Sequence, residues 1–147
     1  MPTNISLYLG SDHAGFKLKE ALKASMDAKR FAIHDLSPRF EDGDDYPLPA
    51  KKVSQAILDE KESIGLLVCG TGHGMEIAAN RFTGIRAVVL RDVKDAKMSR
   101  EHNHANIMVF GGWVTKPALA KKIAMTFLKT KPSKHPRHLR RVKELDA

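Results

Sequence analysis

The sequence predicts an α/β protein in which helices cover both faces of a five-stranded parallel sheet. Short apolar runs typical of strands alternate with segments whose apolar residues recur at helical spacing, which is the pattern of parallel sheets. The third, fourth and fifth runs are almost continuously apolar, as expected of strands buried on both faces. The 147 residues fit one domain, which we expect to span residues 1–147 and to end in a basic helical tail at about residues 132–147.

The first third of the chain predicts two strands with a helix between them. Residues 5–9 form an apolar run that favours a strand. Apolar residues then recur at helical spacing over residues 14–29, and residues 31–35 favour a second, short strand. Three prolines, one glycine and four acidic residues fall in residues 37–49, which we interpret as a surface loop.

The middle of the chain predicts two helices and two strands in alternation. Apolar side chains at residues 53–57 indicate a helix, and residues 64–69 form the next apolar run. After a glycine-rich turn, we expect a short helix from Ile77 that stops at Gly84, because glycine commonly ends helices. Residues 85–90 are the fourth predicted strand.

The last third predicts a polar helix over residues 93–100 and a fifth strand over residues 107–110, which two glycines end. Apolar residues at helical spacing make residues 119–128 a clear amphipathic helix. A break around Pro132 then separates this helix from a last, basic helix near residues 137–145.

Composition excludes several classes of protein. The chain is 42% apolar and 29% charged, as soluble globular proteins are, and no apolar run approaches the roughly 18 residues of a membrane span. One cysteine cannot form an internal disulfide, and the N-terminus lacks the features of a secretory signal. We therefore expect a cytoplasmic protein with no membrane partner.

The net charge of +8 raises the possibility of a nucleic-acid partner. Much of that charge falls late in the chain, and no aromatic residue follows Phe127 to stack on bases. We therefore expect that the protein does not bind nucleic acid.

The most informative segment is the turn Cys69-Gly70-Thr71-Gly72-His73-Gly74. An apolar strand ends at the only cysteine, and three glycines precede a helical pattern. A helix N-terminus concentrates unpaired N–H groups and positive charge, so this turn combines a candidate base or nucleophile with an anion pocket. A tight turn around an inert buried cysteine is the alternative interpretation.

Cofactor and metal sites are weak alternatives. Gly70, Gly72 and Gly74 follow a strand, and Asp92 comes 20 residues after Gly72, but the third glycine arrives one residue too early for a dinucleotide fingerprint. His102 and His104 are spaced unsuitably for one helical face, and no Cys-x-x-Cys or His-Glu-x-x-His is present. We expect no cofactor and no metal.

Polar residues follow several of the predicted strands. They are Asp12-His13, Cys69 to Gly74, Arg91-Asp92 and Gly111-Gly112. Because ligands of parallel sheets bind beyond the carboxyl ends of the strands, one cleft is implied. One thiol, one Asp-His pair, the polar pair His102-Asn103 and the late arginines suit proton transfer on an anionic sugar, with Cys69 as base and Thr71 and the turn amides as donors.

These residues closely resemble the type B ribose-5-phosphate isomerase family, which includes the galactose-6-phosphate isomerase subunits. The motifs that match run in family order over nearly the whole chain. They are Gly10-Ser11-Asp12-His13-Ala14-Gly15-Phe16, Asp45-Tyr46-Pro47, Cys69-Gly70-Thr71-Gly72-x-Gly74, Ile77-Ala78-Ala79-Asn80, Gly84-Ile85-Arg86-Ala87, Ser99-Arg100-Glu101-His102-Asn103 and Arg137-His138-x-x-Arg141.

The resemblance implies a three-layer α/β/α, Rossmann-like domain that forms a homodimer or a larger assembly such as a tetramer, with each active site built from both subunits. By analogy with the family, Cys69 moves a proton between C1 and C2 of a sugar phosphate through a cis-enediolate. Thr71 stabilises that anion, while His102 of the partner subunit, assisted by Asp12, opens the sugar ring.

The resemblance also implies a set of substrate-binding residues. His13, Arg137 and Arg141 hold the phosphate, Asn103 binds sugar oxygens, and Tyr46 lines the pocket. The amides of Gly70, Gly72 and Gly74 face the enediolate.

Each of these roles has a plainer alternative. Asp12 could cap the helix that follows it, and His102 and His13 could be solvated surface groups. Arg137 and Arg141 could be a solvated helix face, although their i, i+4 spacing also presents both guanidinium groups to one phosphate.

The chain departs from the family pattern at three positions. Where some relatives use a glutamate base, this chain has Met75, with Glu76 one residue later at the helix start. Trp113 stands where relatives commonly carry an arginine, and His73 replaces a small or apolar residue. The departures leave the preferred sugar open: ribose 5-phosphate and ribulose 5-phosphate are the expected pair, a hexose 6-phosphate or a four-carbon sugar phosphate is the close alternative, and a non-catalytic sugar-phosphate sensor is the alternative from another class.

Overall fold

A computed structural model describes residues 4–147 and confirms the predicted α/β fold. Five strands form one sheet in the order β2-β1-β3-β5-β4, and every pair is parallel. The strands are β1 (Ile5–Ser11), β2 (Phe31–Asp35), β3 (Ile64–Cys69), β4 (Ala87–Val89) and β5 (Ile107–Gly111).

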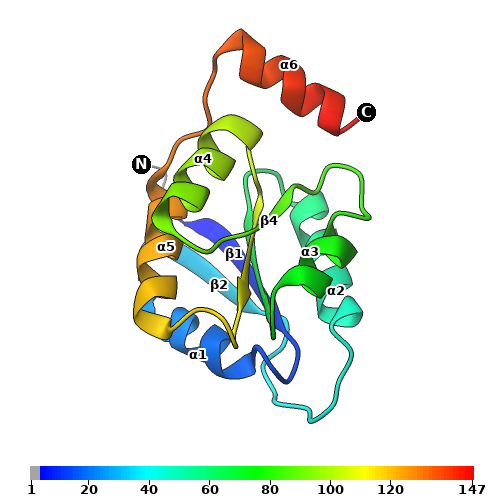
Figure 1. Ribbon diagram of the computed structural model, residues 1–147, viewed down its shortest axis with the longest axis vertical. Coiled ribbons are helices and arrows are strands. Elements are labelled where there is room, and N and C mark those ends of the chain that lie inside the picture. The colour runs from blue at the N-terminus through cyan, green and yellow to red at the C-terminus, as the bar shows by residue number, and fades with distance from the viewer. Residues whose placement is uncertain (1–3) are drawn as a thin grey trace.

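Of the six helices in residues 4–147, five cover the two faces of the sheet, which gives three layers (Figure 1). Apolar residues of α1, α4 and α5 share one core with Leu7, Leu9 and Phe110. Apolar residues of α2 and α3 share a second core with Leu67 and Val109 on the opposite face. The helices are α1 (Phe16–Ser25), α2 (Pro47–Asp59), α3 (His73–Ala79), α4 (Val93–Asn103), α5 (Pro117–Lys129) and α6 (Pro136–Leu145).

Helix α6 lies outside both helical layers, beyond the end of the sheet that is uppermost in Figure 1. His138 is its only buried residue. An ion pair of 2.8 Å between Arg86 and Asp146 links the end of this helix to the segment that precedes β4. Because only one of its side chains is buried, α6 contributes little to the hydrophobic cores of the domain.

Three expectations about element boundaries were wrong. Helix α2 begins at Pro47, inside the predicted surface loop, because two prolines fit the first helical turn, where no N–H partner is needed. Helix α3 begins at His73 rather than Ile77, directly after Gly72, whose φ of 91° turns the chain into the helix. Strand β4 has only three residues and lies at the edge of the sheet, so it is less buried than expected.

The strands that carry the candidate site are the most deeply buried. Every residue of β3 and of β5 is buried, as the apolar runs predicted. A strand buried on both faces has little freedom to shift, so the groups at its carboxyl end are held firmly. No helix in residues 4–147 is both long enough and apolar enough to cross a membrane.

Candidate active site

The parallel register brings Asp12 and Cys69 to the same edge of the sheet. Ser11 pairs with Val68 in the sheet, and the Asp12 N–H donates to the Val68 carbonyl at 3.3 Å. Cys69 follows Val68 and pairs with Gly111 on its other side. The carboxyl ends of three adjacent strands therefore meet around the thiol, as the sequence predicted.

The Cys69 thiol is enclosed by its own turn. Its side chain is buried, with the residue only 4% exposed, and the Gly72 N–H donates to Sγ at 3.2 Å. Gly72 has a φ of 91°, which favours glycine and folds the turn back over the sulfur. The Gly72 N–H therefore holds the sulfur in place within the turn.

Two aromatic rings lie against the glycine turn. A Cβ at Gly70 would come within 2.6 Å of the Trp113 indole, and a Cβ at Gly74 would come within 2.5 Å of the Tyr46 ring. Thr71 lies between these contacts with its side chain exposed, and its Oγ1 accepts the His73 N–H at 3.3 Å. The rings flank the turn and leave the Thr71 hydroxyl accessible.

Asp12 is buried beside this turn. It is 6% exposed, and its Oδ1 accepts the Gly15 N–H at 2.9 Å, just before α1 begins. Burial raises the pKa of this carboxyl and outweighs the opposing effects of the Gly15 N–H and the His13 charge. Gly15 is itself the N-cap of α1 and the helix has no side-chain cap, so the Asp12 contact closes the turn before α1 and is not the helix cap expected as the alternative.

His13 is held by a residue of the loop that precedes α2. The His13 N–H donates to Asp44 Oδ1 at 2.6 Å, and the imidazole Nδ1 lies 3.2 Å from the same oxygen. The hydrogen bond to Asp44 raises the pKa of His13, and the Asp12 charge adds to this effect. Sequence reasoning missed Asp44, because it is one of four acidic residues in a loop without periodicity.

The remaining predicted residues lie at the opposite end of the sheet. Asn103, at the end of α4, lines a hollow with residues 85–88 at the amino end of β4 and with Leu145 of α6. The preceding His102 is half-buried, and its ring stacks on His138 with centroids 4.4 Å apart. Burial lowers the pKa of His138, and the neighbouring His102 and Arg137 lower it further.

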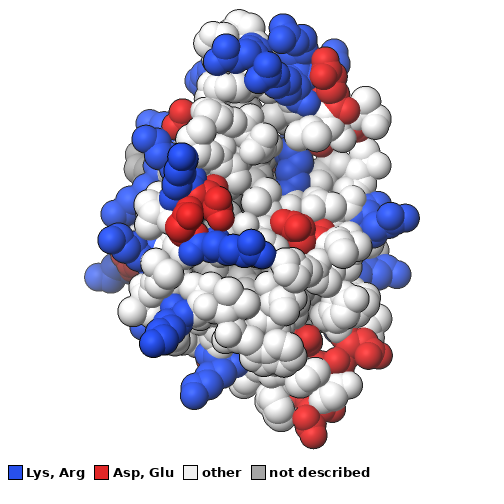
Figure 2. Space-filling model, viewed as in Figure 1, with Lys and Arg blue, Asp and Glu red and all other residues white. Residues whose placement is uncertain are grey.

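Arg137 and Arg141 are both exposed on α6 and make no ion pair within residues 4–147. Lysine and arginine side chains cover the end of the molecule formed by this helix (Figure 2). A single chain thus brings together one group of predicted residues, Asp12, His13, Tyr46 and Cys69 to Gly74, and carries a second group, His102, Asn103, Arg137 and Arg141, at the other end.

The first of these groups suits acid–base chemistry on an anionic carbon compound. It offers a thiol, a buried carboxyl, an imidazole and several N–H groups at one edge of the sheet. Among residues 4–147, no set of three histidine, cysteine or acidic side chains is placed to hold a metal ion.

Comparisons with known proteins identify the family of the chain. Residues 7–145 match the family model described as Ribose/Galactose Isomerase. Ribose-5-phosphate isomerase B of Escherichia coli is 38% identical over 138 residues, covering 94% of this chain and 92% of the relative. Ribose-5-phosphate isomerase B of Mycolicibacterium paratuberculosis is 36% identical, covering 92% of this chain and 86% of the relative.

Solved structures share the fold over nearly the full chain. The ribose 5-phosphate isomerase of Thermotoga maritima has a TM-score of 0.91 at 43% identity and covers 97% of both chains. Ribose-5-phosphate isomerase B of Mycoplasma genitalium, solved with bound ribulose 5-phosphate, has a TM-score of 0.86 at 32% identity, covering 98% of this chain and 95% of that one. The chain therefore belongs to the ribose/galactose isomerase family, and it is an isomerase.

Proposed function

We propose that this protein interconverts ribose 5-phosphate and ribulose 5-phosphate, with Cys69 as the base. The observation that carries the proposal is the Cys69 sulfur, held beside Asp12 and facing the Gly72 N–H in the turn. Family membership supports the reaction type, and the related Mycoplasma genitalium enzyme was solved with ribulose 5-phosphate bound.

The chemistry begins with the open-chain aldose. The Cys69 thiolate takes the proton from C2, the C–H electron pair forms the C1–C2 double bond, and the carbonyl electrons move onto O1. The Thr71 hydroxyl and the amides of Gly70 and Gly74 donate to the enediolate oxygens, whereas the Gly72 N–H, which the resemblance also assigned to the enediolate, faces the Cys69 sulfur. The O2 proton then moves to O1, which becomes a hydroxyl group, and the O2 electrons form the ketose carbonyl at C2. The electrons of the C1–C2 double bond take the proton back from the Cys69 thiol at C1, which regenerates the thiolate.

The other residues open the ring and bind the substrate. His102, assisted by Asp12, moves the protons that open the furanose ring. His13, Arg137 and Arg141 bind the phosphate through charge-assisted hydrogen bonds, Asn103 binds sugar oxygens, and Tyr46 lines the pocket. The reaction calls on no cofactor or metal, and the single cysteine supports a cytoplasmic location.

We further propose a homodimer in which each active site takes residues from both chains. Four of the predicted residues lie at the opposite end of the folded molecule from Cys69: His102, Asn103, Arg137 and Arg141. They therefore cannot reach a substrate bound at the Cys69 thiol of their own chain. Two-fold symmetry would place each group of residues against the complementary group of the partner and would form two equal sites.

Replacement of the thiol tests the proposed base. Cys69→Ala should lower kcat for ribose 5-phosphate by at least about 100-fold, because proton abstraction loses its base. Binding of ribose 5-phosphate, measured by calorimetry, should change by less than about threefold, because the phosphate contacts remain.

Met75→Leu is the matched control, since Met75 is buried in the same segment and a similar apolar volume is retained. It should keep near wild-type turnover. If folded Cys69→Ala isomerises ribose 5-phosphate at a near wild-type rate, Cys69 is not the base.

A six-carbon substrate is the second candidate, because the matching family is described by both ribose and galactose. Assays with four-, five- and six-carbon aldose phosphates at equal concentration distinguish the two. The highest kcat/KM on the five-carbon sugar supports the proposal, whereas the highest value on a six-carbon sugar reassigns the substrate.

A further inference from the structure

We infer that Asp44 is a positioning residue that orients the His13 imidazole toward the phosphate of the substrate. This role rests on the proposed function, in which His13 binds that phosphate. It assigns a task to a residue of the loop between β2 and α2, which acts through His13.

One carboxylate oxygen makes both contacts to His13. Asp44 Oδ1 accepts the backbone N–H at 2.6 Å and lies 3.2 Å from the ring Nδ1. The two contacts fix the backbone and the ring together. The His13 side chain remains 37% exposed, and Asp44 is less exposed, at 24%. Among residues 4–147, Asp44 is the only side chain hydrogen-bonded to this ring, so Nε2 remains for a ligand.

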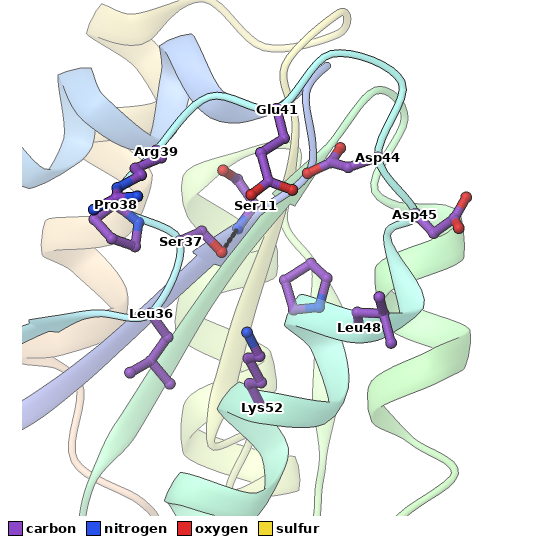
Figure 3. A pocket seen from close by; sticks show the side chains of 11 residues that line it. Ser11, Leu36, Ser37, Pro38, Arg39, Glu41, Asp44, Asp45, Leu48 and Lys52 are labelled. Atoms are coloured by element: carbon purple, nitrogen blue, oxygen red, sulfur yellow. Dashed lines mark hydrogen bonds between the residues drawn. The ribbon is translucent and has the colours of Figure 1, made fainter.

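The contact between Asp44 and His13 is one of the few points at which the loop between β2 and α2 is held, because a cavity separates part of this loop from the sheet. Figure 3 shows the loop arching over the end of β1, with the Ser11 N–H donating to Ser37 Oγ at 3.1 Å. Between this link and Asp44 lies a cavity of about 210 Å³. Ser37 and Asp44 therefore tie the loop to Ser11 and His13, one at each end of the cavity.

Proton placement explains why the link would matter. A neutral imidazole that donates Nδ1–H to Asp44 has a lone pair on Nε2, which repels a phosphate oxygen. An imidazolium donates from both nitrogens, so one N–H can face Asp44 and the other the phosphate.

Other charged groups surround His13 and Asp44. The buried Asp12 lies beside His13, and Glu41 and Asp45 line the cavity with Asp44. Arg39 and Lys52 line the same cavity and supply positive charge. The pKa of His13 is raised, first by the hydrogen bond to Asp44, so its positive form persists to higher pH than in an isolated imidazole.

Asp44→Asn tests this role, because it keeps the shape and an oxygen acceptor but removes the charge. At pH 8 the variant should raise KM for ribose 5-phosphate about 3- to 10-fold, since His13 loses its proton at lower pH. At pH 6, below the ordinary imidazole pKa of about 6.5, KM should differ by less than about twofold, and kcat should stay similar at both pH values.

The matched control is Asp42→Asn, which removes an exposed charge from the same loop and should leave the pH profile of KM unchanged. Asp44→Ser, with a shorter oxygen acceptor, should behave as Asp44→Asn does. A KM ratio between Asp44→Asn and wild type that is the same at pH 6 and pH 8 would overturn the role of the carboxylate charge.

An NMR titration of the His13 ring without sugar gives a readout independent of activity. The pKa of the ring should be lower in Asp44→Asn than in wild type, and an unchanged pKa refutes the inference. His13→Asn separates this inference from the proposed function. If His13→Asn leaves KM unchanged, His13 does not bind the phosphate; if it raises KM while Asp44→Asn does not, only the positioning role fails.

Discussion

Asp12 combines a structural and a chemical task in one side chain. Its Oδ1 accepts the Gly15 N–H and thereby closes the turn before α1, while its burial beside Cys69 raises the pKa of the carboxyl. A carboxyl of this kind is poised to exchange protons, but its ionised form is poorly solvated. Proton chemistry at this position therefore comes at a cost in stability.

Asp12→Asn should separate the two tasks. The amide oxygen can still accept the Gly15 N–H, but no proton can be exchanged, so turnover should fall by at least about 100-fold. Because burial raises the pKa of Asp12 in the folded state, wild type loses stability as the pH rises through that raised pKa.

The Asn variant lacks this loss, so it should unfold at a higher temperature than wild type at pH 7 and at a similar temperature below about pH 4. Calorimetric melting of both proteins at the two pH values measures the effect. If the melting temperature of Asp12→Asn, taken relative to wild type, is lower at pH 7 than at pH 4, the ionised Asp12 carboxylate does not destabilise the wild-type protein.

At the scale of elements, a buried lysine joins α1 to the end of β2. Lys19 is wholly buried, and its Nζ donates to Asp35 Oδ2 at 2.8 Å and to the Ser37 carbonyl at 2.6 Å. Lys23 donates to the same Asp35 oxygen at 2.8 Å. Burial opposes ionisation of Asp35, but the two ammonium groups outweigh it and lower its pKa. The network fixes the point at which the loop that carries Asp44 leaves the sheet.

Asp35→Asn should lower the free energy of unfolding by about 3 kcal/mol at pH 7, because it removes one of the two carboxylates, those of Asp35 and Glu20, that pair with the buried Lys19 ammonium group. Since the pKa of Asp35 is lowered on folding, this stabilisation is present above the ordinary carboxyl pKa and is lost as the pH falls below it. Urea unfolding at pH 7 and pH 3 should show a large difference at the first pH and a smaller one at the second.

Lys23→Met is the control, because the Lys23 ammonium is one-third exposed and its loss should cost less than about 1 kcal/mol. Equal costs for the two substitutions would show that the buried Lys19 does not depend on Asp35.

Some elements could be predicted from the sequence because their signal is local. The apolar runs of β3 and β5 and the position of Cys69 at a strand end follow from patterning and topology. The start of α2 was missed because Pro47 and Pro49 indicate a loop as well as a first helical turn. Asp44 was missed because its contact with His13 depends on the path of a whole loop, which no spacing in the sequence encodes.

At the scale of the whole molecule, the two groups of predicted residues lie at opposite ends. In a parallel sheet each helix returns the chain to the amino edge, so the end of α4 lies far from the strand ends that carry Cys69 and Asp12. Topology alone therefore separates His102 from its own chain's thiol. Helix α6, which buries only His138, extends this second group away from the fold.

Mixed dimers test whether a site is shared. Neither Cys69→Ala nor His102→Asn should be active alone, but a mixed dimer of the two has one site with both changes and one site with neither. Random pairing of equal amounts makes half of the dimers mixed, and one of the two sites in each is intact. Co-expressed subunits should therefore show about one quarter of wild-type specific activity.

Cys69→Ala mixed with Asp12→Asn is the matched control, because both changes lie at the same end of the chain and each site of the mixed dimer keeps one of them. This pair should stay inactive. Failure of the first pair to regain activity, in dimers shown to contain both chains, would rule out sites shared in this way.

The indole that lies against Gly70 has one more consequence. Trp113 is the only tryptophan in the chain, and it is 73% exposed while its ring contacts the residue next to Cys69. The tryptophan fluorescence of this protein therefore comes from a single side chain, which lies beside the Cys69 turn. The molecule carries its own optical reporter of events at that turn, without any added label.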